Sequence, residues 1–341
     1  MSSRSTPPSR GSRPTRSFPV TAAALLVVAS GIVGKTASAS STADPQPEGG
    51  FIAVVALEEA GEVAVLQGPP WRLIRRAEVA AGPHNVVTSP DGDLAAVTSP
   101  QGGAVTLIRA RTGAVVRTIR LGGYPHDAAF GIDGRTLWIS AERAGRLVEI
   151  AVPSGRVIRR VRANGAPHDL DLDGRRNELW VTIDGSSRVD VRNGASGRLV
   201  ARPDLGGAPH DLAVAPGGRA LWFSNWSSGE LTVVSAATRR PIGRVRAGRE
   251  PHHFAFGLGR LWVSDNASGT LASFAPSTRA VLSRIAVGSA PHHVAVAGDQ
   301  VLVAVHSTGR VAVVSQRGHV VDSIAVGSGP HGIAAVSVDP S

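Results

Sequence analysis

The chain has 341 residues, a formal net charge of +10 and no cysteine. The absence of cysteine excludes disulfide frameworks, thiolate metal sites, cysteine nucleophiles and lipid attachment through cysteine. With 40 glycines, 23 prolines and 42% hydrophobic residues, the composition predicts many turns and a large core, which excludes wholesale disorder.

The N-terminal segment has the pattern of an export signal. An arginine-containing head at 1–17 precedes an apolar run at 18–34, and Ala37-Ser38-Ala39 offers a small-residue cleavage site. We expect a secreted, extracytoplasmic protein cleaved near Ala39, with a flexible lead-in at 40–50; an anchor formed by 18–34 is the alternative. Residues 1–39 hold five of the 36 basic residues, so 31 arginines then face 26 acidic residues. This small excess does not indicate a nucleic-acid partner, and we expect no further membrane insertion.

A Pro-His pair recurs along the rest of the chain. Its histidines are His84, His126, His168, His210, His252, His292 and His331. The first five lie 42 residues apart, and the last two intervals are 40 and 39 residues. Each unit holds four short alternating runs separated by glycine-containing turns, which at this period is the pattern of a β-propeller blade.

The two ends of the repeat region supply complementary parts of one blade. After His331 one run remains, at 332–338, whereas three runs precede the first Pro-His, at 51–57, 62–66 and 73–79. We therefore predict that the C-terminal strand is the innermost strand of a last blade completed by the N-terminal strands. The sequence predicts an all-β, seven-bladed propeller of four-stranded blades over 51–341, closed without free edges around the ring.

The unit reads G-x-P-H-x-h-A-h-x-P-x-G-R-x-L-W-h-S-N, followed by h-x-V-h-x-x-x-T-G-x-h-h-x-x-h-x-h-G, where h is hydrophobic. It resembles the YVTN-type (YncE-like) repeat of secreted and periplasmic β-propellers over residues 51–341, which implies this fold and a binding scaffold. More distantly, the Pro-His-Gly and Leu-Trp-Phe runs are similar to those of streptogramin (virginiamycin B) lyases. The context of His252 resembles that of the copper-holding histidine ring of nitrous oxide reductase. A chain without cysteine cannot form that enzyme's dinuclear copper centre, so we do not expect reductase activity.

The first strand of a propeller blade lines the channel, so the seven Pro-His histidines are expected around one mouth. Loops after the second strand reach the same face, and they include Glu142, Trp226 and His306. Neighbouring residues of a strand face opposite ways, so we expect that a ring histidine and its successor do not both point into the channel.

Two interpretations of the repeated Pro-His stay open. In the structural one, proline fixes the start of the strand and the imidazole hydrogen-bonds the backbone of the neighbouring blade. In the functional one, a subset binds a ligand or a metal, because neutral imidazole binds zinc and copper well. The ligand-binding candidates are His84, His126, His168, His210, Trp226 and His331. The metal candidates are His252, His253, His292, His293 and His306, the densest imidazole patch, which His210 or His331 would complete.

Three functions follow from these residues. The leading one is an exported, monomeric binding propeller without turnover, whose histidine-ringed mouth takes a small molecule, a metal or a protein. The second is a copper- or zinc-binding propeller. The third, implied by the resemblance to streptogramin lyases, is a Mg²⁺-dependent C–O lyase with a histidine base, for which Glu142 and His306 are the candidates.

Two further motifs have structural interpretations. Trp138, Trp180, Trp222 and Trp262 share one repeat position, which predicts a core between neighbouring sheets. The Asp-x-Asp-Gly sequence at 171–174 resembles the start of a calcium loop, but it falls on a blade turn and lacks the distal glutamate. We therefore interpret it as a turn.

Overall fold

The computed structural model describes residues 50–338, which belong to one compact unit spanning Pro47–Ser341. The expected export signal at 1–39, and the lead-in up to residue 49, lie outside the described residues. Within 50–338, no helix has both the length and the apolar character needed to cross a membrane.

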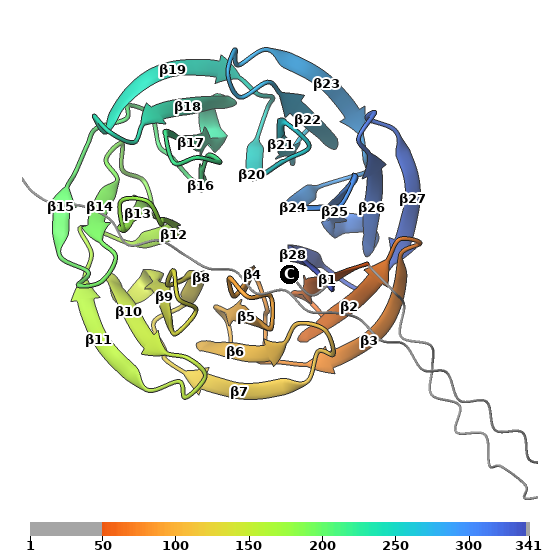
Figure 1. Ribbon diagram of the computed structural model, residues 1–341, viewed down its shortest axis with the longest axis horizontal. Coiled ribbons are helices and arrows are strands. Elements are labelled where there is room, and N and C mark those ends of the chain that lie inside the picture. Colours follow the sequence, from red (N-terminus) through yellow and green to blue (C-terminus); the bar gives the residue numbers. More distant parts are fainter. Residues whose placement is uncertain (1–49, 339–341) are drawn as a thin grey trace, which may run out of the picture. The chain divides into compact units, whose positions relative to one another are not determined.

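The described unit is a seven-bladed β-propeller, as the repeat predicts. Seven antiparallel sheets of four strands surround a central opening, and Figure 1 shows the first strand of each blade nearest to that opening. We number the blades by the order of their Pro-His pairs. Blade 1 contains β4 (Val86–Thr88), β5 (Leu94–Ser99), β6 (Ala104–Arg109) and β7 (Val115–Arg120). Blade 2 contains β8 (Pro125–Phe130), β9 (Thr136–Ala141), β10 (Arg146–Ala151) and β11 (Val157–Arg162).

The next four blades repeat this order from the centre outward. Blade 3 contains β12 (Pro167–Asp173), β13 (Glu178–Ile183), β14 (Asp190–Asn193) and β15 (Leu199–Ala201). Blade 4 contains β16 (Leu212–Val214), β17 (Ala220–Asn225), β18 (Glu230–Ser235) and β19 (Arg240–Arg246). Blade 5 contains β20 (Pro251–Gly257), β21 (Arg260–Asp265), β22 (Thr270–Phe274) and β23 (Val281–Ala286). Blade 6 contains β24 (Pro291–Ala297), β25 (Gln300–Val305), β26 (Arg310–Ser315) and β27 (Val320–Ala325).

Blade 7 closes the ring with strands from both ends of the described chain, which confirms the predicted strand exchange. Its order is β28 (Pro330–Ser337), β1 (Phe51–Leu57), β2 (Glu62–Gly68) and β3 (Arg72–Glu78). Along the junction, Phe51 pairs with Ser337 and Val55 with Ile333. The C-terminal strand is therefore held by backbone pairing along its whole length, and the ring has no open sheet edge at this seam.

The predicted core tryptophans lie between neighbouring sheets. Trp138 of blade 2 packs with Leu170 and Val181 of blade 3, and Trp180 packs with Phe223 of blade 4. All four repeated tryptophans are at most 1% exposed. Each tryptophan thus fills the space between its own sheet and the next one around the ring, which fixes the radial positions of the inner strands.

Three single 3-10 turns follow the second strand of blades 2, 4 and 6. They are η1 (Glu142–Ala144), η2 (Trp226–Ser228) and η3 (His306–Thr308). Each turn ends at a glycine in the left-handed conformation, at φ 58°, 70° and 66°, where a side chain would be strained. The three residues expected in the mouth loops, Glu142, Trp226 and His306, are the first residues of these turns.

Candidate functional site

The histidines of the seven Pro-His pairs form a closed ring around one mouth of the channel. Each imidazole centroid lies between 3.8 and 5.4 Å from the next one around the ring. The ring closes at the strand-exchange seam, where the His84 and His331 centroids are 3.8 Å apart. Seven titratable groups are therefore in contact at one place.

A ring histidine and its successor both reach the channel, so the expectation that they face opposite ways is wrong. The inner strands are irregular at this point: the pairing register shifts between Pro125 and Ala128, and the same shift recurs in blades 3, 5 and 6. A bulge interrupts the alternation of a strand, because its extra residue is not matched on the partner. The successors form a second tier that lines the channel cavity: Asn85, Asp127, Asp169, Asp211, His253 and His293.

The blades are tied together at the ring by hydroxyl groups of the second strand. In blade 2, Ser140 Oγ accepts from Asp127 N at 2.9 Å and donates to the carbonyl oxygen of His168, in blade 3, at 2.6 Å. The same two bonds recur in four further blades through Thr98, Thr182, Ser224 and Ser264. The histidine backbone therefore makes the structural link between blades, and the ring imidazoles are left for other contacts.

One half of the ring is organised by a buried carboxylate. Asp169 Oδ1 lies 3.3 Å from His126 Nδ1, and its Oδ2 lies 3.0 Å from His168 Nδ1 and 3.9 Å from His210 Nδ1. Burial opposes charge on His168, but the charge of Asp169 and the hydrogen bond to it raise the pKa of His168 to about 9. Burial likewise opposes ionisation of Asp169, but the adjacent imidazoles hold its pKa well below the usual value. We call His126, His168 and His210 around Asp169 the Asp169 arc.

The other half of the ring has no such carboxylate. The ligand atoms of His252, His292 and His331 all lie within 4.8 Å of one another. Burial and the neighbouring imidazoles lower the pKa of His252 and His331 well below the usual value, and burial lowers the pKa of His292 to about 4. The Nδ1 atoms of all three are buried and have no hydrogen-bond partner. We call these three neutral histidines the His331 arc.

The remaining metal candidates lie beside this arc. His253 and His293 stack in the second tier with centroids 3.8 Å apart, and His253 Nδ1 accepts a hydrogen bond from Val294 N at 3.3 Å. His306 lies 4.8 Å from His292, ring to ring, and its Nε2 is 3.6 Å from Glu58 Oε2. The nearby carboxylate of Glu58 raises the pKa of His306. His306 thus faces an acid of the mouth, whereas His253 supports the next blade.

The two catalytic candidates belong to different clusters. Glu142 lies with His126 and His168, on the side of the Asp169 arc. His306 pairs with Glu58 beside His292. Glu142 and His306, the two catalytic candidates, therefore each lie with a different set of residues.

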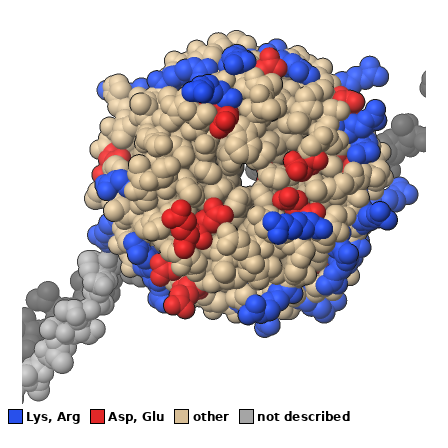
Figure 2. Space-filling model, turned by 180° about the vertical axis from the view of Figure 1, so that it is seen from behind, with Lys and Arg blue, Asp and Glu red and all other residues tan. Residues whose placement is uncertain are grey.

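Trp226 stands apart from the repeated tryptophans because it is 38% exposed. Its ring lies edge-on to His210 and His252, with centroids at 4.9 and 5.7 Å. A cavity of about 400 Å³ opens beside it, and Asp184 and Glu250 line this cavity. Figure 2 shows acidic side chains gathered around the central opening and basic side chains mainly toward the margin.

The calcium-like sequence at 171–174 is a structural turn, as interpreted from the sequence. Asp171 is half-buried and accepts hydrogen bonds from Leu172 N and Val214 N. Asp173 binds Arg176 and accepts from the backbone of its own turn. Both carboxylates are thus engaged by the protein.

Two functional features were missed in the sequence. The hydroxyl links could have been found, because in blades 1 to 5 a Ser or Thr directly follows the Leu-Trp-x or Leu-Ala-Ala-Val run. The role of Asp169 had no such signal, because Asp127 and Asp211 occupy the same repeat position and do not bind the ring imidazoles.

A family model described as YNCE-like beta-propeller matches residues 16–341. Among solved structures, the periplasmic gluconolactonase PpgL of Pseudomonas aeruginosa gives a TM-score of 0.72 at 19% identity, over 85% of this chain and 99% of that one. A Desulfotomaculum acetoxidans protein described as functionally unknown gives 0.73 at 11% identity, over 85% and 99%. Hydrazine synthase of Kuenenia stuttgartiensis gives 0.68 at 14% identity, over 76% and 93%. No curated protein matches the sequence. At these identities the structural likeness concerns the fold alone.

Proposed function

We propose that this chain, which belongs to the YNCE-like β-propeller family, is a binding propeller that holds a zinc or copper ion at its channel mouth. The propeller fold presents a rigid ring of blades around this mouth. The observation that carries this proposal is the His331 arc, in which the ligand atoms of His252, His292 and His331 lie within 4.8 Å of one another. Three imidazoles from consecutive blades form a site that is held in place by the ring itself.

The chemistry of the donors favours a borderline transition metal. Imidazole must be neutral to bind a metal, and burial keeps these three groups neutral at physiological pH. Their buried Nδ1 atoms lack partners in the protein, which is costly unless a ligand occupies them. Nitrogen donors suit zinc and copper, whereas magnesium and calcium require oxygen. Three protein ligands leave one position of a tetrahedral site open for an exogenous ligand.

The surroundings of the mouth favour a cationic ligand. Glu58, Glu142, Asp184 and Glu250 lie beside the ring imidazoles or line the cavity next to them. The chain as a whole is basic, but acidic side chains gather around the central opening of the face that Figure 2 shows. Acidic groups around a concave mouth raise the local cation concentration and its rate of arrival.

A second candidate is the binding of a small organic molecule at Trp226. The half-exposed indole, the cavity of about 400 Å³ and charged groups of both signs, Arg249 and Glu250, support this function. Such a molecule would sit against His168 and His210 of the Asp169 arc, which line the same cavity.

The metal proposal is tested with mature protein purified without a histidine tag. We expect one Zn²⁺ or Cu²⁺ per chain, and a His292→Ala change should weaken binding at least about 100-fold because it removes a direct ligand. The matched control is His126→Ala, which removes a ring imidazole from the Asp169 arc and should leave affinity unchanged. Equal losses of metal affinity in both variants would show that the metal does not bind at the His331 arc. An absence of metal binding by the unchanged protein would refute the proposal.

We propose further that the protein is exported and acts outside the cytoplasm. The basic head, the apolar run and the small residues Ala37 and Ala39 support cleavage near Ser40. Mass spectrometry of the exported protein tests this. An intact N-terminus in the membrane fraction would instead favour an anchor.

A further inference from the structure

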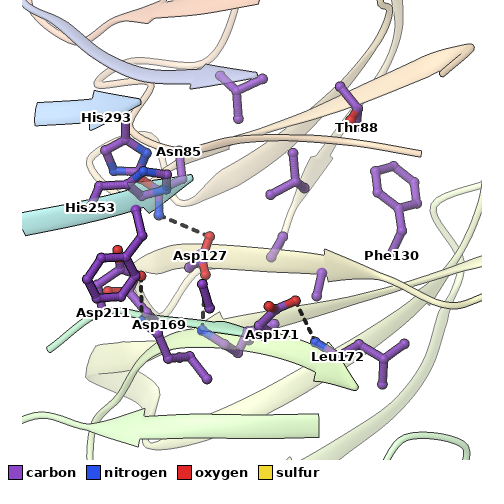
Figure 3. Close-up of a pocket in the computed structure, with 18 of the residues that line it drawn as sticks. Asn85, Thr88, Asp127, Phe130, Asp169, Asp171, Leu172, Asp211, His253 and His293 are labelled. Carbon is purple, nitrogen blue, oxygen red and sulfur yellow. Dashed lines mark hydrogen bonds between the residues drawn. The ribbon is translucent and has the colours of Figure 1, made fainter. Parts of the chain in front are cut away.

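The channel contains a chamber that the ring site does not use. It has a volume of about 510 Å³ and extends from the second tier toward the opposite face. Pro90, Ile132 and Gly174, at the turns that follow the inner strands, line its far end. Figure 3 shows this chamber, with Asp169 and Asp211 on one side, Phe130 and Leu172 on the other, and Asp127 and Asp171 between them.

Three of the four carboxyl groups that line the chamber are fully engaged by the protein. Asp169 binds the imidazoles of the ring. Asp127 and Asp171 each accept hydrogen bonds on both oxygens, one of them from the backbone of the next blade. The donors are Asn85 Nδ2 and Leu170 N for Asp127, and Leu172 N and Val214 N for Asp171. Asp127 and Asp171 therefore link neighbouring blades.

Asp211 is the exception. Its side chain is buried, with 8% of the residue exposed, and its Oδ1 accepts from Leu212 N at 2.6 Å. Its Oδ2 is buried and has no hydrogen-bond partner. Asp211 lines the chamber, so one oxygen of a carboxyl group in its wall is left without a protein partner.

From this geometry we infer that the chamber binds a primary ammonium group that carries a short apolar chain, with Asp211 Oδ2 as its acceptor. An ammonium group offers three N–H donors and a positive charge, and it needs few acceptors. A metal ion needs several oxygens at short range, and of the chamber carboxylates only Asp169 belongs to a cluster with ligand atoms within 4.8 Å of one another. Ala129, Ala213 and Phe254 provide apolar wall for the chain of the ligand.

The charge balance of the chamber agrees with a cationic ligand. Burial, and then the charges of Asp169 and Asp127, raise the pKa of Asp211 well above its usual value. The protein supplies no cation to Asp211, unlike Asp169, which has His168. The raised pKa favours a proton on Asp211 in the empty chamber, so an ammonium group that supplies the missing charge would release this proton as it binds. The ligand would enter from the face opposite the histidine ring.

The probe is butylammonium chloride, titrated by calorimetry into the mature protein with EDTA present, so that the metal site plays no part. We expect one binding event per chain. Affinity should rise up to about 4-fold per methylene from methylammonium to butylammonium, as the chain covers apolar wall. Butyltrimethylammonium keeps the charge and the chain but has no N–H donor, so it should bind at least about 10-fold more weakly.

The variant Asp211→Asn should lower butylammonium affinity at least about 10-fold. Its matched control is Asp171→Asn, which changes a carboxyl group of the same chamber whose oxygens both have backbone donors. No heat with butylammonium, equal affinity in Asp211→Asn, or equal binding of the trimethyl probe would each overturn the inference. If Asp211→Asn does not fold, the comparison of the two probes on the unchanged protein decides alone.

Discussion

The Asp169 arc and the His331 arc are built from the same Pro-His motif, yet they differ in charge and chemistry. In the first, the carboxylate of Asp169 faces three imidazoles and keeps His168 protonated, with its pKa raised to about 9. In the second, the successors of the ring histidines are His253, His293 and Gly332, and the imidazoles stay neutral. One carboxylate, that of Asp169, therefore distinguishes the two arcs; Asp127 and Asp211 follow His126 and His210 at the same repeat position but do not pair with the ring.

The seam at His331 also differs from the rest of the ring in how the blades are joined. Hydroxyl groups link each inner strand to the next from blade 1 to blade 6. In blades 6 and 7, Ala304 and Ala56 occupy the equivalent position, as the pairing of β24 with β25 and of β28 with β1 shows. The part of the ring that holds His331 thus depends on strand exchange, whereas the Asp169 arc lies among blades that are linked directly.

The largest expected effect comes from deleting residues 330–341, which removes β28 and His331. Blade 7 loses its innermost strand, and the core formed by Val55, Leu57 and Ile333 is exposed to water. We expect unfolding or aggregation, although the Asp169 arc lies in other blades, because β1 loses its hydrogen-bonding partner and becomes an exposed edge strand. Circular dichroism and size-exclusion chromatography measure this. A melting temperature equal to that of the full chain would contradict the exchange of strands.

Acid pH should act on the His331 arc in the metal-free protein. His252, His292 and His331 have folded-state pKa values below 6.5, so the unfolded chain binds more protons below that pH. Their neutral burial is therefore fully favourable above pH 6.5, and stability falls as the pH drops. Each group contributes up to about 1.4 kcal/mol per pH unit, or about 4 kcal/mol for the three. Urea unfolding with chelator present should show a smaller loss of unfolding free energy between pH 6.5 and 5.5 for His292→Ala than for the unchanged protein. Equal losses would contradict the lowered pKa of His292.

Alkaline pH should act on the Asp169 arc. The pKa of His168 is raised from 6.5 to about 9, so its ion pair with Asp169 stabilises the fold fully below pH 6.5 and is lost as the pH rises through 9. The contribution is at most about 3 kcal/mol. Asp169→Asn should therefore be less stable than the unchanged protein at pH 6.5, and the difference should shrink toward pH 9.5. Parallel pH profiles in denaturant would show that the charge on His168 does not depend on Asp169.

The fold was readable from the sequence because its information is periodic. The spacing of Pro-His fixed the number of blades, and the missing runs after His331 revealed the exchange of strands. The division of the ring into two arcs was not readable, because it depends on contacts between blades. Alternation suggested that Asp169 would face away from His168, but the bulge at the start of the inner strand brings both into the channel. The unpaired Oδ2 of Asp211 also depends on contacts between blades. Asp127, at the equivalent repeat position, accepts a hydrogen bond from Leu170 N of the next blade, whereas Asp211 Oδ2 has no such donor.

The smallest expected effect concerns the hydroxyl links, and it uses both arcs. Ser140→Ala removes the acceptor for Asp127 N and the donor to the His168 carbonyl, so we expect a loss of about 1–2 kcal/mol. The reciprocal change, Ala304→Ser, introduces a hydroxyl at the position where the equivalent serine of blade 2 binds the carbonyl oxygen of the next ring histidine. If that link forms to His331, the gain should be smaller, at most about 1 kcal/mol, because Ala304 is fully buried and an added oxygen must also be accommodated. Chemical denaturation of both variants checks these values. A neutral Ser140→Ala would mean that the blades are held by their tryptophan-filled interfaces alone, and the contrast in linkage between the two arcs would then have no consequence for stability.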